Sequence, residues 1–352
     1  MQTPPHTGSP LLAAALHSAP LPGSSVPNEL RALLNHAGVF DRNTRTAFAC
    51  HGQDRVRWLN GMVTNHVGEL QPHRGCYAFV LNAQGRIQGD VNIFQMGDSL
   101  WLDIAATQAA TLLAYLEHYI IMDDVVLAPL PETHRIGIAG PQAAAWLTQM
   151  GLSVAELQPL EIGEVNWNGV PITVIAAHSP IVPYYDLWIA PKNAADFSQA
   201  LLAAGFTACG ATAIEQLRIL EGTPLYGKDI VDRDLPQETN QTRALHFSKG
   251  CYLGQEIVER IRSRGNVHRI FTGFVLDSGF SLDAASPARL PVLSGDQTVG
   301  EITSSTQIEH SDGSRQGIAL GYIRREALDK KMELHCSGHP VRPETIPFTK
   351  IL

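Results

Sequence analysis

KGCYLGQEIVERIRSRGNVHR, residues 249–269, separates two parts of the chain that differ in sequence pattern. Upstream of it, strand-like runs and helix-like segments are intermixed; downstream, short β-prone runs alternate with turns rich in Gly, Ser, Asp and Pro. The first pattern is typical of an α+β body, and the second of a small β-barrel or sandwich. We therefore predict an α+β protein with a small C-terminal β-barrel that begins near residue 270.

Length and composition bound the class of protein. The chain has 352 residues, 44% of them hydrophobic, and a net charge of −8. This length predicts about two or three domains, and the acidic balance argues against direct nucleic-acid binding. Five cysteines without a C-x-x-C pair indicate a reducing compartment. No apolar run is long enough to span a bilayer, so we predict a cytoplasmic protein without a membrane partner.

Changes of pattern along the chain suggest the domain limits. The start is rich in Pro, Ser and Gly, which is typical of disorder. There is no G-x-G-x-x-G and no P-loop, so a nucleotide site has no support. The predicted units are a disordered tail (1–28), two α+β domains (29–130 and the ferredoxin-like 131–210), a connecting segment packed on the body (211–269) and the barrel (270–352).

Cys251 is the strongest candidate for reactive chemistry. It precedes a helix that we expect to begin near Gly254, and the positive end of a helix dipole stabilises a thiolate. Lys249 would act in the same direction, whereas Glu256 and Glu259 would oppose it. The alternative is that Cys251 is a buried small hydrophobic residue, the usual role of a free cysteine.

The arginines that follow, among them Arg260 and Arg262, also allow two interpretations. Guanidinium groups in this arrangement can hold the carboxylate or phosphate of a ligand. Alternatively, they occupy an exposed helix face on which Glu256 pairs with Arg260 across one turn. Both interpretations stay open at the level of sequence.

Two aspartates interrupt strand-like segments. Asp90 follows a Gly-rich hairpin in GRIQGDVNIF, and Asp186 interrupts the apolar run YYDLWIA. Each is either a carboxylate that contacts a ligand or a structural residue, stabilising a turn at 90 and facing outward at 186. Cys336 and His339 have a ligand-like spacing without a second pair, so we predict no metal site.

Residues 249–265 resemble the signature of the YgfZ-type proteins, Lys-Gly-Cys-aromatic-x-Gly-Gln-Glu. The upstream segments LRILEGTPLYGKDI, LPQETN, RWLNGMVTNHVGEL and LNAQGRIQGD are similar to the same superfamily. Its other branch is the aminomethyltransferase (T-protein) of the glycine cleavage system. The resemblance covers residues 38–269, and the C-terminal β domain fits it loosely.

This resemblance implies a three-domain, aminomethyltransferase-like body around a central opening that holds tetrahydrofolate, with 29–130 as the first part of the folate-binding domain. The YgfZ-type branch implies assembly, maintenance or repair of iron–sulfur clusters and support of tRNA modification. Iron–sulfur client enzymes and cluster-assembly proteins would be the partners of a monomer. Cys251 and Lys249 would then form the functional pair. The expected folate contacts are Asp90, Asp186, Arg218, Tyr252 and Arg260.

The alternative is a tetrahydrofolate-dependent aminomethyltransferase of the T-protein type. The T-protein has two adjacent aspartates where this chain has Gly89-Asp90, and a glycine-rich acidic turn where this chain has SPIVPYYDLW (179–188). It also lacks the Lys-Gly-Cys signature. These departures favour the YgfZ-type interpretation. Whether the chain turns over a substrate is left open.

Overall fold

The computed structural model describes residues 25–265, 267–277, 289–310 and 312–351. Most of the predicted tail therefore lies outside the described residues. Helix α2 (Val26–Asn35) begins inside the last part of that tail. Pro27 stands in its first turn, where the missing N–H costs nothing, and Leu30 and Leu33 are buried.

The first sheet is antiparallel throughout and carries helices α3 (Arg55–Met62) and α4 (Ala106–Glu117). The Gly-rich hairpin predicted before Asp90 is confirmed, because the turn at 82–85 joins two paired strands. In order across the sheet, the strands are β3 (Gly75–Leu81), β4 (Ile87–Gln95), β5 (Leu100–Ala105), β2 (Arg45–His51) and β6 (Val126–Pro129).

The second sheet packs against helices α5 (Ala143–Gln149) and α6 (Ala194–Ala203). Its strands, in order, are β11 (Thr207–Ala208), β1 (Gly38–Asp41), β7 (His134–Ala139), β10 (Tyr184–Ile189), β9 (Val170–Ala176) and β8 (Ile162–Trp167). Strand β1 lies within the range predicted for the first domain but pairs with β7 and β11 of the second sheet. The first predicted domain thus contributes one strand to the second sheet.

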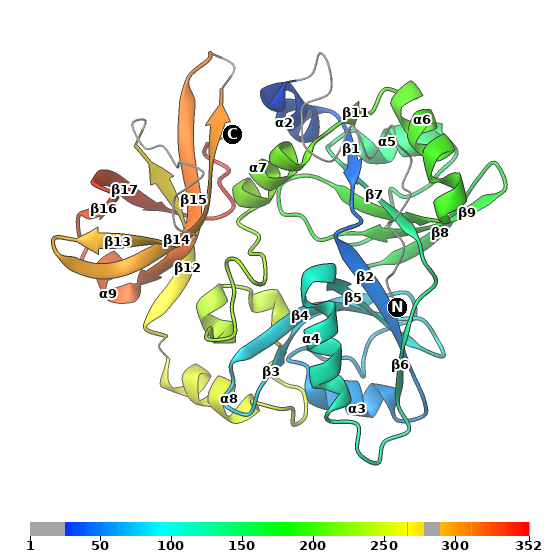
Figure 1. Cartoon of the computed structure of the whole chain (residues 1–352), viewed down its shortest axis with the longest axis horizontal. Helices are drawn as coiled ribbons and strands as arrows, with labels where there is room; N and C mark the ends of the chain where they lie inside the picture. Colours follow the sequence, from blue (N-terminus) through cyan, green and yellow to red (C-terminus); the bar gives the residue numbers. More distant parts are fainter. Residues whose placement is uncertain (1–24, 266, 278–288, 311, 352) are drawn as a thin grey trace, which may run out of the picture.

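The C-terminal part is a closed barrel, and the predicted α+β class with a small C-terminal β-barrel is confirmed. Figure 1 shows α2 and helix α7 (Ala211–Glu221) between this barrel and the second sheet. Around the barrel, the strands are β12 (Arg269–Leu276), β15 (Arg315–Arg324), β14 (Gln297–Glu309), β13 (Leu290–Ser294), β16 (Leu334–Cys336) and β17 (His339–Glu344). The short helix α9 (Arg325–Asp329) follows β15.

The connecting segment holds two 3-10 turns, η2 (Pro236–Thr239) and η3 (Thr242–Ala244), and helix α8 (Gln255–Arg264). Among the described residues, no helix combines the length and apolar character required to cross a membrane. Cytoplasmic placement and a monomeric state stay predictions.

A buried carboxylate fixes the barrel to the rest of the chain. Asp229 in the connecting segment has no exposed surface and accepts hydrogen bonds from Arg218 of α7 at 2.7 Å and from Ser304 Oγ of β14 at 2.7 Å. Thr303 Oγ1 and the backbone N–H of Leu225 also donate to it. One side chain therefore connects helix, connecting segment and barrel.

Asp229→Ala should destabilise the protein by about 3–5 kcal/mol, because it leaves the Arg218 guanidinium buried with one charge partner fewer. Urea unfolding measures this loss. The exposed Asp98 provides the control, and Asp98→Ala should change the unfolding free energy by less than about 0.5 kcal/mol. Equal unfolding midpoints for the two variants would contradict this role of Asp229.

Candidate active site in the central pocket

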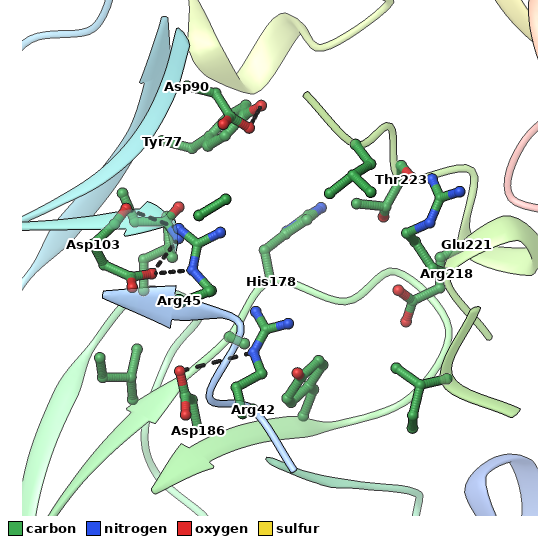
Figure 2. A pocket seen from close by; sticks show the side chains of 18 of the residues that line it. Arg42, Arg45, Tyr77, Asp90, Asp103, His178, Asp186, Arg218, Glu221 and Thr223 are labelled. Carbon is green, nitrogen blue, oxygen red and sulfur yellow. Dashed lines mark hydrogen bonds and ion pairs between the residues drawn. The ribbon is translucent and has the colours of Figure 1, made fainter. Parts of the chain in front are cut away.

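A cavity of about 200 Å³ lies where both sheets, α7 and the connecting segment meet, and we call it the central pocket. Figure 2 shows Asp90 and Tyr77 on one side, Arg218 and Glu221 on another, and His178 between them. The ionisable side chains that line it are Arg42, Arg45, Tyr77, Asp90, Asp103, His178, Tyr184, Asp186, Glu215, Arg218, Glu221 and Arg243.

Asp90 on β4 is presented into this pocket in a fixed orientation. The Tyr77 hydroxyl donates to Asp90 Oδ2 at 2.8 Å, and Gln108 Nε2 donates to Oδ1 at 2.6 Å. Burial, together with the nearby charge of Asp90, raises the pKa of Tyr77 well above its ordinary value, so the phenol stays a hydrogen-bond donor. The sequence prediction of Asp90 as a pocket residue agrees with this position.

The neighbouring Gly89 faces away from the pocket. A Cβ added there would lie 2.8 Å from Gln108 Oε1 and 2.8 Å from a methyl carbon of Leu112 on α4. Adjacent strand residues point to opposite faces, so a side chain at 89 would meet α4 rather than a ligand. The departure from the T-protein's aspartate pair therefore removes no group from the pocket side of β4.

Asp186 on β10 is also a pocket residue, and the outward-facing alternative is wrong. The residue is only 4% exposed, and its Oδ1 has no hydrogen-bond partner within the described part of the chain. Its closest charges are Arg42 Nε at 3.9 Å and Arg135 Nη1 at 4.0 Å. Burial consequently raises its pKa. The Tyr184 hydroxyl is likewise buried and has no hydrogen-bond partner among the described residues, so both groups can bind a polar ligand or water at the cavity wall.

Arg218 lines the pocket, but the structure uses its guanidinium as a brace. Its donors bond Glu215 at 2.7 and 2.8 Å, Asp229 at 2.7 Å, the Thr223 carbonyl at 2.6 Å and Ser304 Oγ at 2.8 Å. These five bonds match the five N–H groups of an arginine. The expected contact between Arg218 and a folate carboxylate would have to displace one of them.

Arg243 has donors to spare instead. Its guanidinium lies over the Tyr77 ring at 4.0 Å, and its Nε donates to Gln241 Oε1 at 3.3 Å. Its terminal nitrogens have no hydrogen-bond partner among the residues that the structure describes. Arg42 resembles it, since its Nε also lacks a hydrogen-bond partner there. Neither residue stands out in the sequence.

Lys249 lies outside the central pocket and closes helix α3. Its ammonium is buried and donates to the carbonyls of Asn60 at 2.6 Å, Val63 at 2.7 Å and Asn65 at 2.7 Å. These carbonyls belong to the C-terminal end of α3 and the residues after it, which have no partners within the helix. Burial lowers the pKa of Lys249 to about 8. The Lys249 ammonium donates all three of its hydrogens to carbonyls. Lys249 therefore has a structural role here instead of the predicted support of the Cys251 thiolate.

The other predicted residues of this stretch also lie outside the central pocket, so the structure does not bring them together with Asp90 and Asp186 there. Cys251 is exposed, so the alternative of a buried residue is wrong. Tyr252 lies beneath the Lys249 ammonium, 4.9 Å from nitrogen to ring centre. Arg260 is exposed on α8, and Arg262 pairs with Glu259 at 3.4 Å. The predicted pair of Glu256 with Arg260 is not among the ion pairs of the described residues.

Cys251 should be the one fast-reacting thiol of the native protein. Burial raises the pKa of Cys50 and Cys76 to about 12 and protects Cys209 and Cys336. A thiol reagent such as DTNB should therefore titrate one group rapidly in the folded state, and Cys251→Ser should remove that phase. A second fast thiol, or a fast phase that persists in the variant, would contradict the placement.

Burial shifts the pKa values of Glu221 and His178 in the pocket in opposite directions. Glu221 is 9% exposed and accepts a hydrogen bond from Ser179 Oγ; burial raises its pKa to about 7, against the opposing effect of Arg42, Arg243 and Arg218. Burial lowers the pKa of His178 to about 4. At neutral pH the imidazole is therefore uncharged, while Glu221 is close to half-protonated.

The stability of the protein should record the titration of Glu221. Its pKa rises from 4.5 to about 7 on folding, so its contribution is fully present below the unfolded value and is lost as the pH rises through the folded value. Between about pH 4.5 and pH 7.5, the wild type should lose about 3 kcal/mol more unfolding free energy than Glu221→Gln.

Urea unfolding at both pH values measures this difference. The exposed helix residue Glu117 provides the control, because Glu117→Gln should leave the pH dependence of the wild type unchanged. If Glu221→Gln and the wild type lose the same unfolding free energy over this range, Glu221 does not titrate as its burial requires.

Comparison with known proteins places this geometry in context. Residues 21–249 match the family model described as the GCVT N-terminal domain. The aminomethyltransferase of Thermus thermophilus is 25% identical over 98% of this chain and 96% of its own length, and that of Geobacillus kaustophilus is 25% identical over 94% and 91%. The aminomethyltransferase T structure from Bartonella henselae has a TM-score of 0.79 at 20% identity and covers 93% of this chain and 90% of its own.

These relatives contradict the predicted main function. Proteins that align over nearly the whole chain are named aminomethyltransferases, which matches the alternative. The predicted maintenance of iron–sulfur clusters and support of tRNA modification is therefore corrected. The predicted folate cofactor is consistent with the family match.

Proposed function

We propose that this chain, which belongs to the family of the GCVT N-terminal domain, is a folate-dependent one-carbon transferase of the aminomethyltransferase type. The observation that carries the proposal is the carboxylate of Asp90, held by Tyr77 and Gln108 at the wall of the central pocket. A carboxylate fixed by two neutral donors needs no reorganisation when it acts on a reacting group.

The pocket fits a reduced folate in the chemistry of its walls. The orphaned Asp186 Oδ1 can accept from the N–H groups of a pterin ring, and the orphaned Tyr184 hydroxyl can pair with a ring acceptor. Arg42, whose Nε lies 3.9 Å from Asp186, can donate to an acceptor of the same ring, and Arg243 has free donors that suit the carboxylates of the glutamate tail. Bound tetrahydrofolate would supply the amine nitrogens that accept a one-carbon unit.

The residues of the chain would divide the remaining work. Asp90 would hold or accept a proton at Oδ2, while the Tyr77 hydroxyl and Gln108 keep the carboxylate oriented. His178 is uncharged at neutral pH, so it can accept or donate a hydrogen bond without adding charge to the pocket. Arg243 over the Tyr77 ring places a cation beside the same wall.

The position of Gly89 answers the objection that this chain has Gly89-Asp90 where the T-protein has two adjacent aspartates. A second aspartate at 89 would point toward α4, so one carboxylate on the pocket face is all that β4 can present at this pair. The YgfZ-type signature does not enter the proposal, because Lys249 closes α3 and Cys251 is exposed outside the pocket.

Asp90→Asn should lower the rate of one-carbon transfer by about 10²–10⁴-fold, since it removes the proton acceptor but keeps the shape of the side chain. Methylenetetrahydrofolate formed from an aminomethylated carrier protein measures transfer, and calorimetric titration measures tetrahydrofolate affinity. The affinity should change far less than the rate. Asp98→Asn, at an exposed position, is the matched control.

Two outcomes would contradict the proposal at different levels. If the wild type binds tetrahydrofolate but transfers no one-carbon unit, the proposed transferase activity is wrong and the proposed folate site stands. If the wild type binds no reduced folate, both the folate site and the transferase activity are wrong.

A further inference from the structure

A second cavity, of about 630 Å³, lies between the barrel and the turn that joins β3 to β4. Its lining residues come from that turn, from the connecting segment and from β12 to β15, and none of them also lines the central pocket. We call it the arginine groove, because five arginines line it: Arg86, Arg233, Arg269, Arg289 and Arg324.

Three of these arginines are matched by carboxylates. Glu301 on β14 accepts hydrogen bonds from Arg233 at 2.8 Å, Arg269 at 3.0 Å and Arg289 at 2.9 Å. Arg269 also bonds the buried Asp234 at 2.5 Å, and it lies 3.2 Å from Glu238. These three carboxylates balance three guanidinium charges and hold them in fixed orientations.

The other two arginines leave the groove with surplus positive charge. Arg86 and Arg324 are exposed, and within the described part of the chain neither is in an ion pair. Arg86 donates to the carbonyl of Arg233. Glu326, whose charge interacts with Arg324, is already paired with Lys330 at 2.6 Å. Among the described residues, the groove therefore carries about two positive charges without an ion-pair partner, in a protein whose net charge is −8.

The shape and donor chemistry of the groove point to an organic ligand. Its volume is within the range of small-molecule sites. Guanidinium groups pair with the oxygens of phosphates and carboxylates in a bidentate manner, and those of Arg233, Arg269 and Arg289 are already oriented by Glu301. Arg86 belongs to the body and Arg324 to the barrel, so a ligand with more than one anionic group could pair with both.

We propose that the arginine groove binds a small organic anion with two or more phosphate or carboxylate groups, which bridges the body and the barrel. The proposal is independent of the folate site, because the two cavities share no lining residue. If the groove is purely structural, replacing Arg86 and Arg324, which form no ion pairs with the described residues, should leave anion binding unchanged.

The test titrates tripolyphosphate and citrate separately into the full-length protein by calorimetry, at constant ionic strength. The wild type should bind at least one probe at a single saturable site, and the tighter probe identifies phosphate or carboxylate as the preferred group. The double variant Arg86→Gln/Arg324→Gln should weaken that binding at least tenfold, since each guanidinium contributes charge-assisted hydrogen bonds.

A double variant that removes the same charge elsewhere on the barrel is the control. Arg315→Gln/Arg342→Gln changes two exposed arginines that do not line the groove and should leave the affinity unchanged. Urea unfolding verifies that all variants are folded. The proposal is overturned if neither probe saturates, if the groove variant binds as the wild type does, or if both double variants lose affinity equally.

Discussion

The buried carboxylate of Asp103 connects the two sheets that form the walls of the central pocket. It lies on β5 of the first sheet, is 3% exposed, and accepts from Arg45 of β2 at 2.7 Å and from Arg135 of β7 in the second sheet at 2.5 Å. Although burial opposes its charge, these two arginines lower the pKa of Asp103 to about 2. The two sheets are therefore connected by an ion pair that persists until the pH falls from about 4 toward 2.

The ion pairs of Asp103 also determine which arginines of the pocket remain available to a ligand. Arg45 and Arg135 are committed to Asp103, and the Arg135 guanidinium lies 3.8 Å above the ring of Trp188. Asp186 lies 3.9 Å from Arg42, and its Oδ1 accepts no hydrogen bond from the described residues. The well-paired Asp103 and the poorly paired Asp186 thus divide structural and ligand-facing roles between two buried carboxylates (Figure 2).

Local patterns in the sequence were sufficient for much of the fold and for part of the site. The hairpin at 82–85 and the change to short β runs near 270 depend on neighbouring residues, and they were predicted. Strand β1 was not assigned to the second sheet, because its partners come from residues far along the chain. Asp90 and Asp186 were found, since charged residues in apolar strands stand out; Arg42 and Arg243 were not, because which arginines stay unpaired depends on long-range contacts.

The Lys-Gly-Cys signature illustrates how packing can account for a motif. Lys249 bonds carbonyls that lie up to 189 positions away in sequence, and Gly254 has a positive φ and packs so closely that an added Cβ would lie 2.5 Å from the carbonyl oxygen of Asn82. Gln255 Oε1 accepts from the backbone N–H of Tyr252. The contacts of Lys249 and Gly254 attach the start of α8 to α3 and to the β3–β4 turn, and that of Gln255 lies within the turn before α8. Packing and local bonding account for these three signature residues, so the pocket chemistry is argued from Asp90 and its neighbours.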